Sequence, residues 1–271
     1  MGFYSPSQLV QDVRRHGVEV RPVDINCSAW DCTLEEDGAL RLGFRLVKGL
    51  SRRSADRLMQ SRPALGFPSV AAAQRQGQLA RNDWDALAAA GALNSLGGHR
   101  YQARWELLAA NPELALGDAR VAENQVRWLP APDEQADLEE DFRHLGLSLG
   151  RHPLALLRER GELAGCLRAE QLSQCRPGQL VRVAGVVTNR QRPGTASGVT
   201  FVTLEDESGQ INLIVWRDTA RAQRQALLGA RLLKVSGVLE REGAVIHVVA
   251  GRLTDITGQW QALSLRSRDF H

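Results

Sequence analysis

Residues 47–53 (VKGLSRR) carry the residue types that best suit contact with a phosphate. A glycine lets the backbone turn tightly, so that the amides at the start of the following helix can face an anion. The order apolar, glycine, apolar is typical of a helix-hairpin-helix turn, although Ser51 stands where a second glycine is usual. The pattern predicts a DNA-binding set of Lys48, Gly49, Ser51, Arg52 and Arg53. An ordinary helix capped by Ser51 is the alternative.

A second helical pair follows at residues 80–109, and its turns are also rich in glycine. Such modules usually occur in pairs, because one buries the apolar face of the other. The residues that enter the next helix complete the predicted DNA-binding set: Gly97, Gly98, His99 and Arg100. The large apolar residues of this stretch are predicted to form the core of the pair: Trp84, Leu87, Leu93, Trp105 and Leu108.

The third candidate surface lies near residues 198–216, where polar and apolar residues alternate. Alternation of period two displays one face of a strand while the other face packs, and oligonucleotides bind such a face in small barrels. The neighbouring loops 189–198 and 240–243 carry arginines. The predicted nucleic-acid-binding set here is Arg190, Arg192, Phe201, Arg217 and Arg241. Few aromatics are available for base stacking, so protein contact is an alternative use of this surface.

Nothing in the sequence predicts a catalytic or metal site. A two-metal polymerase site needs carboxylates clustered on neighbouring strands. The acidic runs lie in turns or helical stretches and are predicted to be solvated surface: Glu35-Glu36-Asp37, Asp133-Glu134, Glu139-Glu140-Asp141 and Glu205-Asp206-Glu207. The four cysteines have no zinc-ligand spacing, so free thiols are expected. We therefore expect no cofactor and no catalysis by this chain alone.

Two architectures must position these residues. Up to about residue 109 the pattern is helical, apart from short strand-like runs before residue 51. Beyond Pro177 five strand-like runs follow, with one helical stretch (DTARAQRQALL) after the third, which is the order of an OB barrel. The predicted fold is a tandem helix-hairpin-helix domain followed by a five-stranded OB-fold. The predicted segments are residues 1–38, 39–110, an acidic linker 111–164, and 165–271.

The charge distribution agrees with two nucleic-acid-binding modules. Residues 1–110, 111–164 and 165–271 carry net charges of +3, −5 and +5, so an acidic segment separates two basic ones. The chain has neither a membrane-length apolar run nor the apolar core of a signal peptide, so we expect a cytoplasmic protein. Met1 could be an internal methionine of a longer chain.

Several stretches resemble the C-terminal part of the bacterial C-family DNA polymerases: FYSPSQLVQDVRRHGVEV, LGFRLVKGLSRRSADRL, LAAAGALNSLGGHR, FVTLEDESGQINLIVW and the ending SRDFH. Among these the chain is most similar to the error-prone, mutasome-associated (ImuC-type) paralogue of the replicative alpha subunit. The resemblance covers essentially the whole chain. It implies that residues 1–38 end a fingers domain, and that the palm with its catalytic aspartates and Mg²⁺ lies elsewhere in the parent.

The resemblance also implies partners: DNA, an inactive Y-family-like polymerase and a RecA-like accessory protein. The parent would synthesise DNA across lesions. Replicative alpha subunits bind the sliding clamp through a pentapeptide that ends in an aromatic residue, but Glu139 stands at that place after Gln135. A charge suits an apolar pocket poorly, so clamp recruitment is expected to depend on a partner.

Two other functions stay open at this point. The basic OB domain and the acidic linker could form a protein-interaction module for mutasome partners, with DNA contacts secondary. The run FVTLEDESGQINLIVW also resembles the anticodon-binding OB domains of class II tRNA synthetases, which would make the chain a tRNA-binding accessory.

Overall fold

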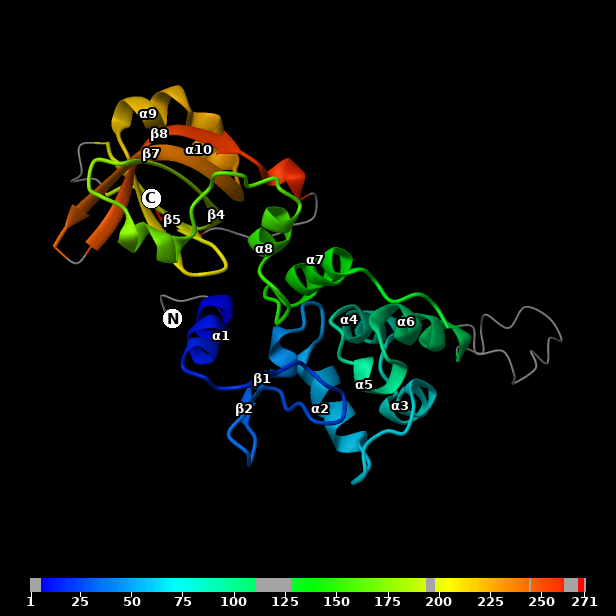
Figure 1. Ribbon diagram of the computed structural model, residues 1–271. Helices are drawn as coiled ribbons and strands as arrows, with labels where there is room; N and C mark the ends of the chain where they lie inside the picture. The colour runs from blue at the N-terminus through cyan, green and yellow to red at the C-terminus, as the bar shows by residue number, and fades with distance from the viewer. Residues whose placement is uncertain (1–5, 111–127, 194–197, 244, 261–267, 271) are drawn as a thin grey trace. The chain divides into compact units, whose positions relative to one another are not determined.

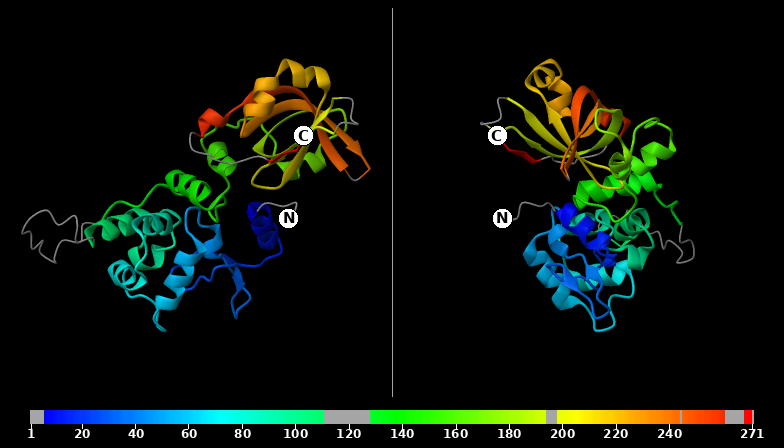
Figure 2. Two further views of the ribbon diagram at one scale, coloured as in Figure 1. Left: turned by 180° about the vertical axis from the view of Figure 1, so that it is seen from behind. Right: turned by 60° about the vertical axis from the view of Figure 1, so that its left-hand side comes forward.

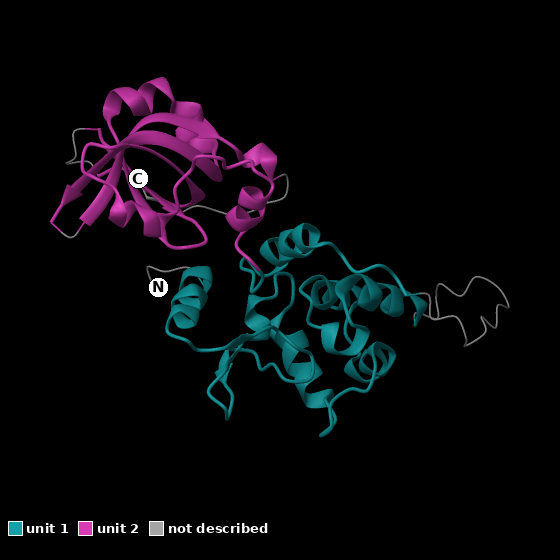
Figure 3. Ribbon diagram, viewed as in Figure 1, with its two compact units in different colours: residues 1–150 teal, residues 151–271 magenta. Residues whose placement is uncertain are grey.

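The computed structural model describes residues 6–110, 128–193, 198–243, 245–260 and 268–270. Its contacts divide the chain into two compact units, Met1–Gly150 and Arg151–His271, called here the N-terminal and C-terminal units (Figure 3). This division lies inside the predicted linker 111–164. Residues 111–127 of that linker, residues 194–197 of the predicted loop 189–198, and parts of the quoted N-terminal and SRDFH stretches lie outside the described residues.

The N-terminal unit is mainly helical (Figure 1). Its helices are α1 (Pro6–Arg15), η1 (Phe44–Leu46), α2 (Arg52–Ser61), α3 (Val70–Gly77), α4 (Arg81–Ala89), α5 (Asn94–Gly97), α6 (Arg100–Ala109) and α7 (Glu134–His144). A small sheet of order β1-β3-β2 is formed by Val20–Arg21, Leu40–Arg41 and Thr33–Leu34. Every helix within the described ranges is too short or too polar to cross a lipid bilayer.

One apolar core holds the N-terminal unit together. Trp84, Leu87 and Leu93 are buried in it, as predicted. Val23 and Ile25 belong to the same core, so residues 1–38 and 39–110 share it. The prediction was wrong for two other residues: Trp105 is 49% exposed and Leu108 is 41% exposed. They lie on the outer side of α6, because other side chains, Ala103 and Leu107 among them, fill the inner side of that helix.

The C-terminal unit is built on a β-barrel. Its elements are α8 (Pro153–Glu159), η3 (Ala169–Gln174), β4 (Leu180–Gln191), β5 (Thr200–Glu205), β6 (Gln210–Val215), α9 (Arg217–Ala222), α10 (Arg224–Gly229), β7 (Leu232–Glu242), β8 (Val245–Asp255), η4 (Thr257–Gln259) and β9 (Arg268–Phe270). The sheet order is β5-β6-β8-β7-β4-β9, and a β4–β5 pairing closes it. The five long strands therefore form a closed barrel with the OB order, β6 and β8 being parallel.

Side chains at alternate positions along the strands fill the interior of the barrel. In β5 and β6 alternate residues, Val202, Leu204, Ile211 and Leu213, are buried in a core with residues of β4, β7 and β8. The helices α9 and α10 connect β6 to β7 and lie together against β8 at one end of the barrel (Figures 1 and 2). Exposed arginines of both helices, Arg217, Arg221 and Arg224, lie at this end.

Candidate nucleic-acid interface

The first hairpin has the backbone that its sequence predicts. Gly49 has φ of +90°, in the left-handed region, so the chain reverses between η1 and α2 at that residue. Ser51 caps α2, and its hydroxyl accepts a hydrogen bond from the Ser54 amide at 3.1 Å. The first amides of a helix have no partner within the helix, and here they start at Arg52. Together they form an N-terminus that suits an anion.

Exposed guanidinium groups flank this helix start. Arg52 and Arg53 are both exposed, and Arg53 has no ion pair among the described residues. The Arg52 guanidinium lies 5.9 Å from the centre of the Trp30 ring and 3.7 Å from the Asp56 carboxylate. Such surface contacts contribute little to stability, so both arginines can turn to a phosphate at small cost.

Lys48 has a structural partner instead. Its Nζ donates to the carbonyl oxygens of Phe142 and Arg143, at 3.0 and 2.9 Å, and its backbone amide donates to His144 O. These carbonyls form the C-terminal end of α7, where a cation is favoured. The predicted DNA contact of Lys48 therefore competes with its contact to α7.

The second hairpin has left-handed glycines but no free cation. Gly91 and Gly98 have φ of +73° and +78°. His99 caps α6, and its Nδ1 accepts the Gln102 amide at 3.3 Å. Its Nε2 lies 3.0 Å from Leu129 O, so both ring nitrogens are occupied within the protein. Gly97 is buried, and a Cβ there would lie 3.1 Å from Ala103. This glycine therefore serves helix packing.

The structure corrects the prediction for Arg100. Its side chain is 2% exposed, so it cannot reach DNA. Nη1 donates to Ala89 O and Nη2 donates to Asp141 Oδ1, both at 2.7 Å, and Nε lies 2.7 Å from Asp137 Oδ1. Helix α7 supplies both carboxylates, and so it neutralises the cation that the sequence assigned to a phosphate.

Two carboxylates of α7, Glu140 and Asp141, are correspondingly not solvated surface, which corrects the prediction for the run Glu139-Glu140-Asp141, whereas Asp133 and Glu134 are exposed as predicted. Glu140 is buried and accepts a 2.6 Å bond from Arg104. Burial favours a higher pKa for Glu140, but Arg104 and the other nearby cations outweigh it and hold the pKa below its usual range. For Asp141 burial prevails over the bonds from Ser148 and Arg100, and its pKa is raised.

The hairpin between β5 and β6 also departs from the prediction of a solvated acidic turn. Asp206 is only 2% exposed, and its Oδ1 accepts the amides of Ser208 and Gly209 at 2.8 and 2.9 Å. Within the described ranges, no group of three or more His, Cys, Asp and Glu side chains could hold a metal ion. The described part of the chain therefore offers Mg²⁺ no donor set of the kind that a polymerase site needs.

Two rows of side chains lie on the outer face of the barrel, across β5, β6 and β8. Strand register aligns Phe201 with Ile214 and Val249, and aligns Thr203 with Asn212 and His247. Phe201 is 41% exposed, so it belongs to the displayed face and not to the core. Trp216, after β6, is 55% exposed. The face thus carries one aromatic ring, with a second ring at its edge.

The arginines predicted around this face have different environments. Arg190 is 5% exposed, which corrects its assignment to nucleic acid. Its Nε donates to Leu227 O at 2.6 Å, and Nη2 donates to Ala230 O. The guanidinium therefore binds carbonyls at the end of α10. Arg241 is exposed but donates to Ser173 O at 2.8 Å. Arg192 and Arg217 are exposed at a pocket.

Two arginines of this pocket, Arg221 and Arg224, were not among the predicted residues. A signal was available, because Arg217, Arg221 and Arg224 recur at the i, i+4, i+7 spacing that places residues on one face of a helical stretch. The predicted set came from the displayed strand face, the neighbouring loops and Arg217 after the third strand, and it did not extend along the helical stretch that follows Arg217.

The two modules of the fold each match a family model. Residues 17–103 match a family model described as "Helix-hairpin-helix motif", and residues 181–256 match one described as "OB-fold nucleic acid binding domain". Over about a third of its length the chain is also similar to asparaginyl-tRNA synthetase from Pyrococcus horikoshii, at 19% identity, covering 22% of that structure. The TM-score of that match is 0.30, too low to support any conclusion.

Along its entire length the chain is homologous to part of the error-prone DNA polymerases. It is 54% identical to the "Error-prone DNA polymerase" of Alkalilimnicola ehrlichii, 50% to that of Methylococcus capsulatus and 50% to that of Vibrio campbellii. Each match covers 100% of this chain and 27%, 28% and 27% of the relative. The chain thus spans about a quarter of these relatives, and its two modules fit the C-terminal part that the sequence predicted.

Proposed function

We propose that this chain is the DNA-binding C-terminal region of an error-prone, translesion DNA polymerase. The observation that carries the proposal is the high sequence identity to error-prone polymerases over the whole chain. It is combined with a first hairpin in which the N-terminal amides of α2 can bind an anion. The first hairpin grips duplex DNA through phosphates, using the start of α2 with Arg52 and Arg53. The outer face of the barrel around Phe201 holds a single strand.

Binding of duplex DNA tests the hairpin. We expect the double variant Arg52→Gln/Arg53→Gln to bind a 20-base-pair duplex more weakly and without change of sequence preference. The slope of log K against log salt flattens by about 0.9 for each lost phosphate contact, so by about 1.8 in total. Arg75→Gln/Arg81→Gln, which removes two exposed arginines from α3 and α4, is the matched control. A double variant that keeps the affinity and the slope of the control would overturn the proposal for this hairpin.

The catalytic part of the proposal concerns the parent protein. The parent performs template-directed synthesis with Mg²⁺ held by aspartates of its palm, in the cytoplasm, alongside an inactive Y-family-like polymerase and a RecA-like accessory protein. The chain by itself then extends no primer with Mg²⁺ and four nucleotides. Extension that co-purifies with the chain through several columns would contradict this. The residues of the clamp-like segment, Gln135 to Glu139, lie inside α7 with Leu138 buried, which favours indirect clamp recruitment.

A second function, docking of a protein partner, is supported by exposed apolar side chains of the N-terminal unit. Trp105 and Leu108 lie on one side of α6, and Trp128 is 72% exposed. Large exposed apolar side chains suit a protein partner better than a phosphate backbone. A titration with labelled duplex, single strand and tRNA, at two salt concentrations, separates the functions. Tight binding of tRNA alone would favour the tRNA-binding accessory instead.

A further inference from the structure

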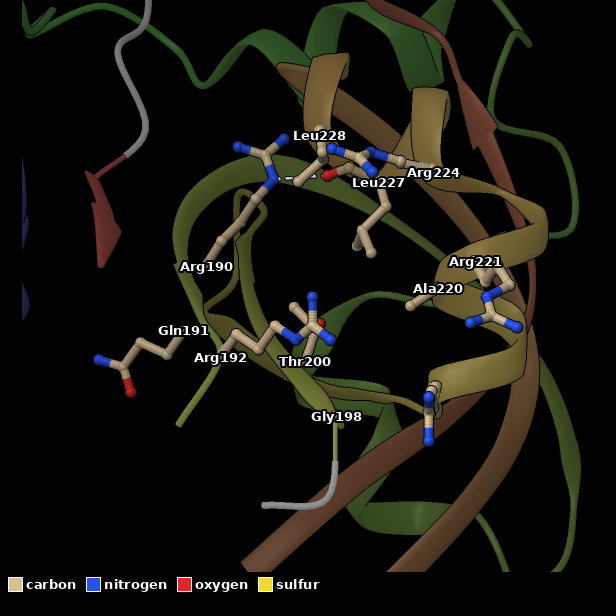
Figure 4. Close-up of a pocket in the computed structure, with 11 residues that line it drawn as sticks. Arg190, Gln191, Arg192, Gly198, Thr200, Ala220, Arg221, Arg224, Leu227 and Leu228 are labelled. Atoms are coloured by element: carbon tan, nitrogen blue, oxygen red, sulfur yellow. Dashed lines mark hydrogen bonds between the residues drawn. The ribbon is translucent and has the colours of Figure 1, made fainter. Parts of the chain in front are cut away.

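A pocket of about 500 Å³ opens at the end of the barrel, between the start of β5 and the helices α9 and α10. Five arginines line it, together with an apolar patch from the helices: Arg190, Arg192, Arg217, Arg221 and Arg224. Figure 4 shows Arg192 reaching in from the strand side, while Arg221 and Arg224 are carried by the helices opposite. Its volume lies in the range of small-molecule sites, roughly 300–1,000 Å³.

Four of the five arginines have no counter-charge. Arg192, Arg217, Arg221 and Arg224 are all exposed, and none of them makes an ion pair or a side-chain hydrogen bond within the described part of the chain. No carboxylate is among the described residues that line the pocket. Like charges gathered in a concave surface repel one another and concentrate a positive potential. A bound anion relieves that repulsion.

The fold restrains two of these arginines, Arg217 and Arg224. The buried guanidinium of Arg190, on β4, donates to the carbonyls of Leu227 and Ala230 at the end of α10. These bonds hold α10 against β4, and Arg224 is the first residue of α10. Gly198 has φ of +84°, and a Cβ there would lie 3.2 Å from the side-chain carbons of Arg217. The stem of Arg217 therefore packs against the backbone at Gly198. The two contacts restrain the helix that carries Arg224 and the aliphatic stem of Arg217 before a ligand binds, which reduces the entropy lost on binding.

We propose that this pocket binds two or more neighbouring phosphate groups. A guanidinium presents planar, paired donors that match phosphate oxygens, and four of them exceed what a single phosphate needs. The phosphates come from one of two sources, the backbone of a single strand or the chain of a free nucleoside triphosphate. The pocket is separate from the outer face, because Thr200 lies inside it whereas Phe201, the next residue along β5, is displayed outside. The proposal is therefore independent of stacking on Phe201.

Direct binding to the full chain tests the pocket. The probes are a fluorescent dT12 strand, dTTP and inorganic tripolyphosphate. Whichever of these probes the pocket binds, the variant Arg221→Gln/Arg224→Gln should bind it roughly tenfold more weakly than the unchanged chain does. For dT12 the slope of log K against log salt should flatten by about 1.4, at about 0.7 for each lost contact. Arg160→Gln/Arg176→Gln removes two exposed arginines elsewhere in the C-terminal unit and is the control.

The probes identify the source of the phosphates. If Arg221→Gln/Arg224→Gln weakens binding of dT12 but not of dTTP or tripolyphosphate, the strand backbone is the ligand. If it weakens binding of dTTP and tripolyphosphate but not of dT12, the pocket is a nucleotide site. Equal binding of all probes by this double variant and by the control overturns the proposal, as does tighter binding of an oligo-aspartate peptide than of any phosphate. Arg192→Gln/Arg217→Gln, from the other side of the pocket, must give the same result. Duplex binding through Arg52 and Arg53 is unaffected, so failure of the hairpin and failure of the pocket are distinguishable.

Discussion

Replacement of Arg100 by alanine should destabilise the N-terminal unit without a direct effect on phosphate contacts. The guanidinium is buried at 2% exposure and joins α6 to Asp137 and Asp141 of α7. Its removal leaves Ala89 O without this donor and leaves Asp141 with Ser148 as its remaining side-chain donor. Burial already raises the pKa of Asp141, and loss of the neighbouring cation raises it further.

The expected magnitude is large. Removal of one partner of a buried ion pair costs about 3–5 kcal/mol, because the other partner is left buried without compensation. A domain of this size is stable by about 5–15 kcal/mol in total. Arg100→Ala should therefore retain a folded but weakened unit, in which the contact between α6 and α7 opens at least about 100-fold more often.

Hydrogen exchange of the full chain, followed by peptide, is the assay. We expect faster exchange in peptides that cover α6 and α7 and unchanged exchange in the barrel. Arg53→Ala, which removes an exposed arginine of the same unit, should leave both unchanged. If Arg100→Ala keeps the protection of α7 and instead flattens the salt dependence of duplex binding by about 0.9, the assignment of Arg100 to the core is refuted.

Three further changes test other parts of the molecule. Phe201→Ala should weaken dT12 binding by about 1–3 kcal/mol with little change in the melting temperature, because the ring is displayed on the outer face. A lower melting temperature with unchanged affinity would instead place the ring in the core. Gly49→Ala should cost about 1–2 kcal/mol of stability, because an alanine is strained at a φ of +90°. The new Cβ would lie 3.8 Å from the Ala86 Cβ, so no clash adds to this cost. A melting curve equal to that of the wild type would contradict the left-handed turn. His152 has a pKa lowered to about 4 by burial, and its Nδ1 accepts a hydrogen bond from the Leu154 amide in the first turn of α8. Unfolding therefore takes up a proton between pH about 6.5 and 4, so the C-terminal unit should lose about 3 kcal/mol as the pH falls through that window, and His152→Asn should flatten the dependence. A pH profile identical in both proteins would argue against the buried neutral ring.

Much of the fold could be predicted from the sequence, because local patterns encode it. The alternating residues of β5 and β6 gave the strands, and the helical stretch after β6 gave the OB order. Gly49 marked the first hairpin, since its left-handed φ strongly favours glycine at that position. The prediction for Trp105 was wrong because apolar character predicts burial only on the packed side of a helix, and Ala103 and Leu107 fill that side.

The site was less predictable, because an arginine in a sequence does not reveal its partner. Arg52, Arg100, Arg190 and Arg224 all follow patterns that suit a phosphate. In the structure Arg100 reaches Asp141, 41 residues away, and Arg190 reaches Leu227 O, 37 residues away. A segment that distant comes close only when the chain has folded, so no local window contains the information.

The sequence by itself thus determined the period of each element, the turns that need glycine, and the excess of positive charge at both ends of the chain. Only the tertiary structure decided which cations are free. Arg100 and Arg104 form ion pairs with carboxylates of α7, and Arg190 donates to a carbonyl near the end of α10. Among the described residues, the pocket arginines Arg192, Arg217, Arg221 and Arg224 make neither an ion pair nor a side-chain hydrogen bond. Burial without such a partner would cost more than folding returns, so those side chains stay in water, where an anion can reach them.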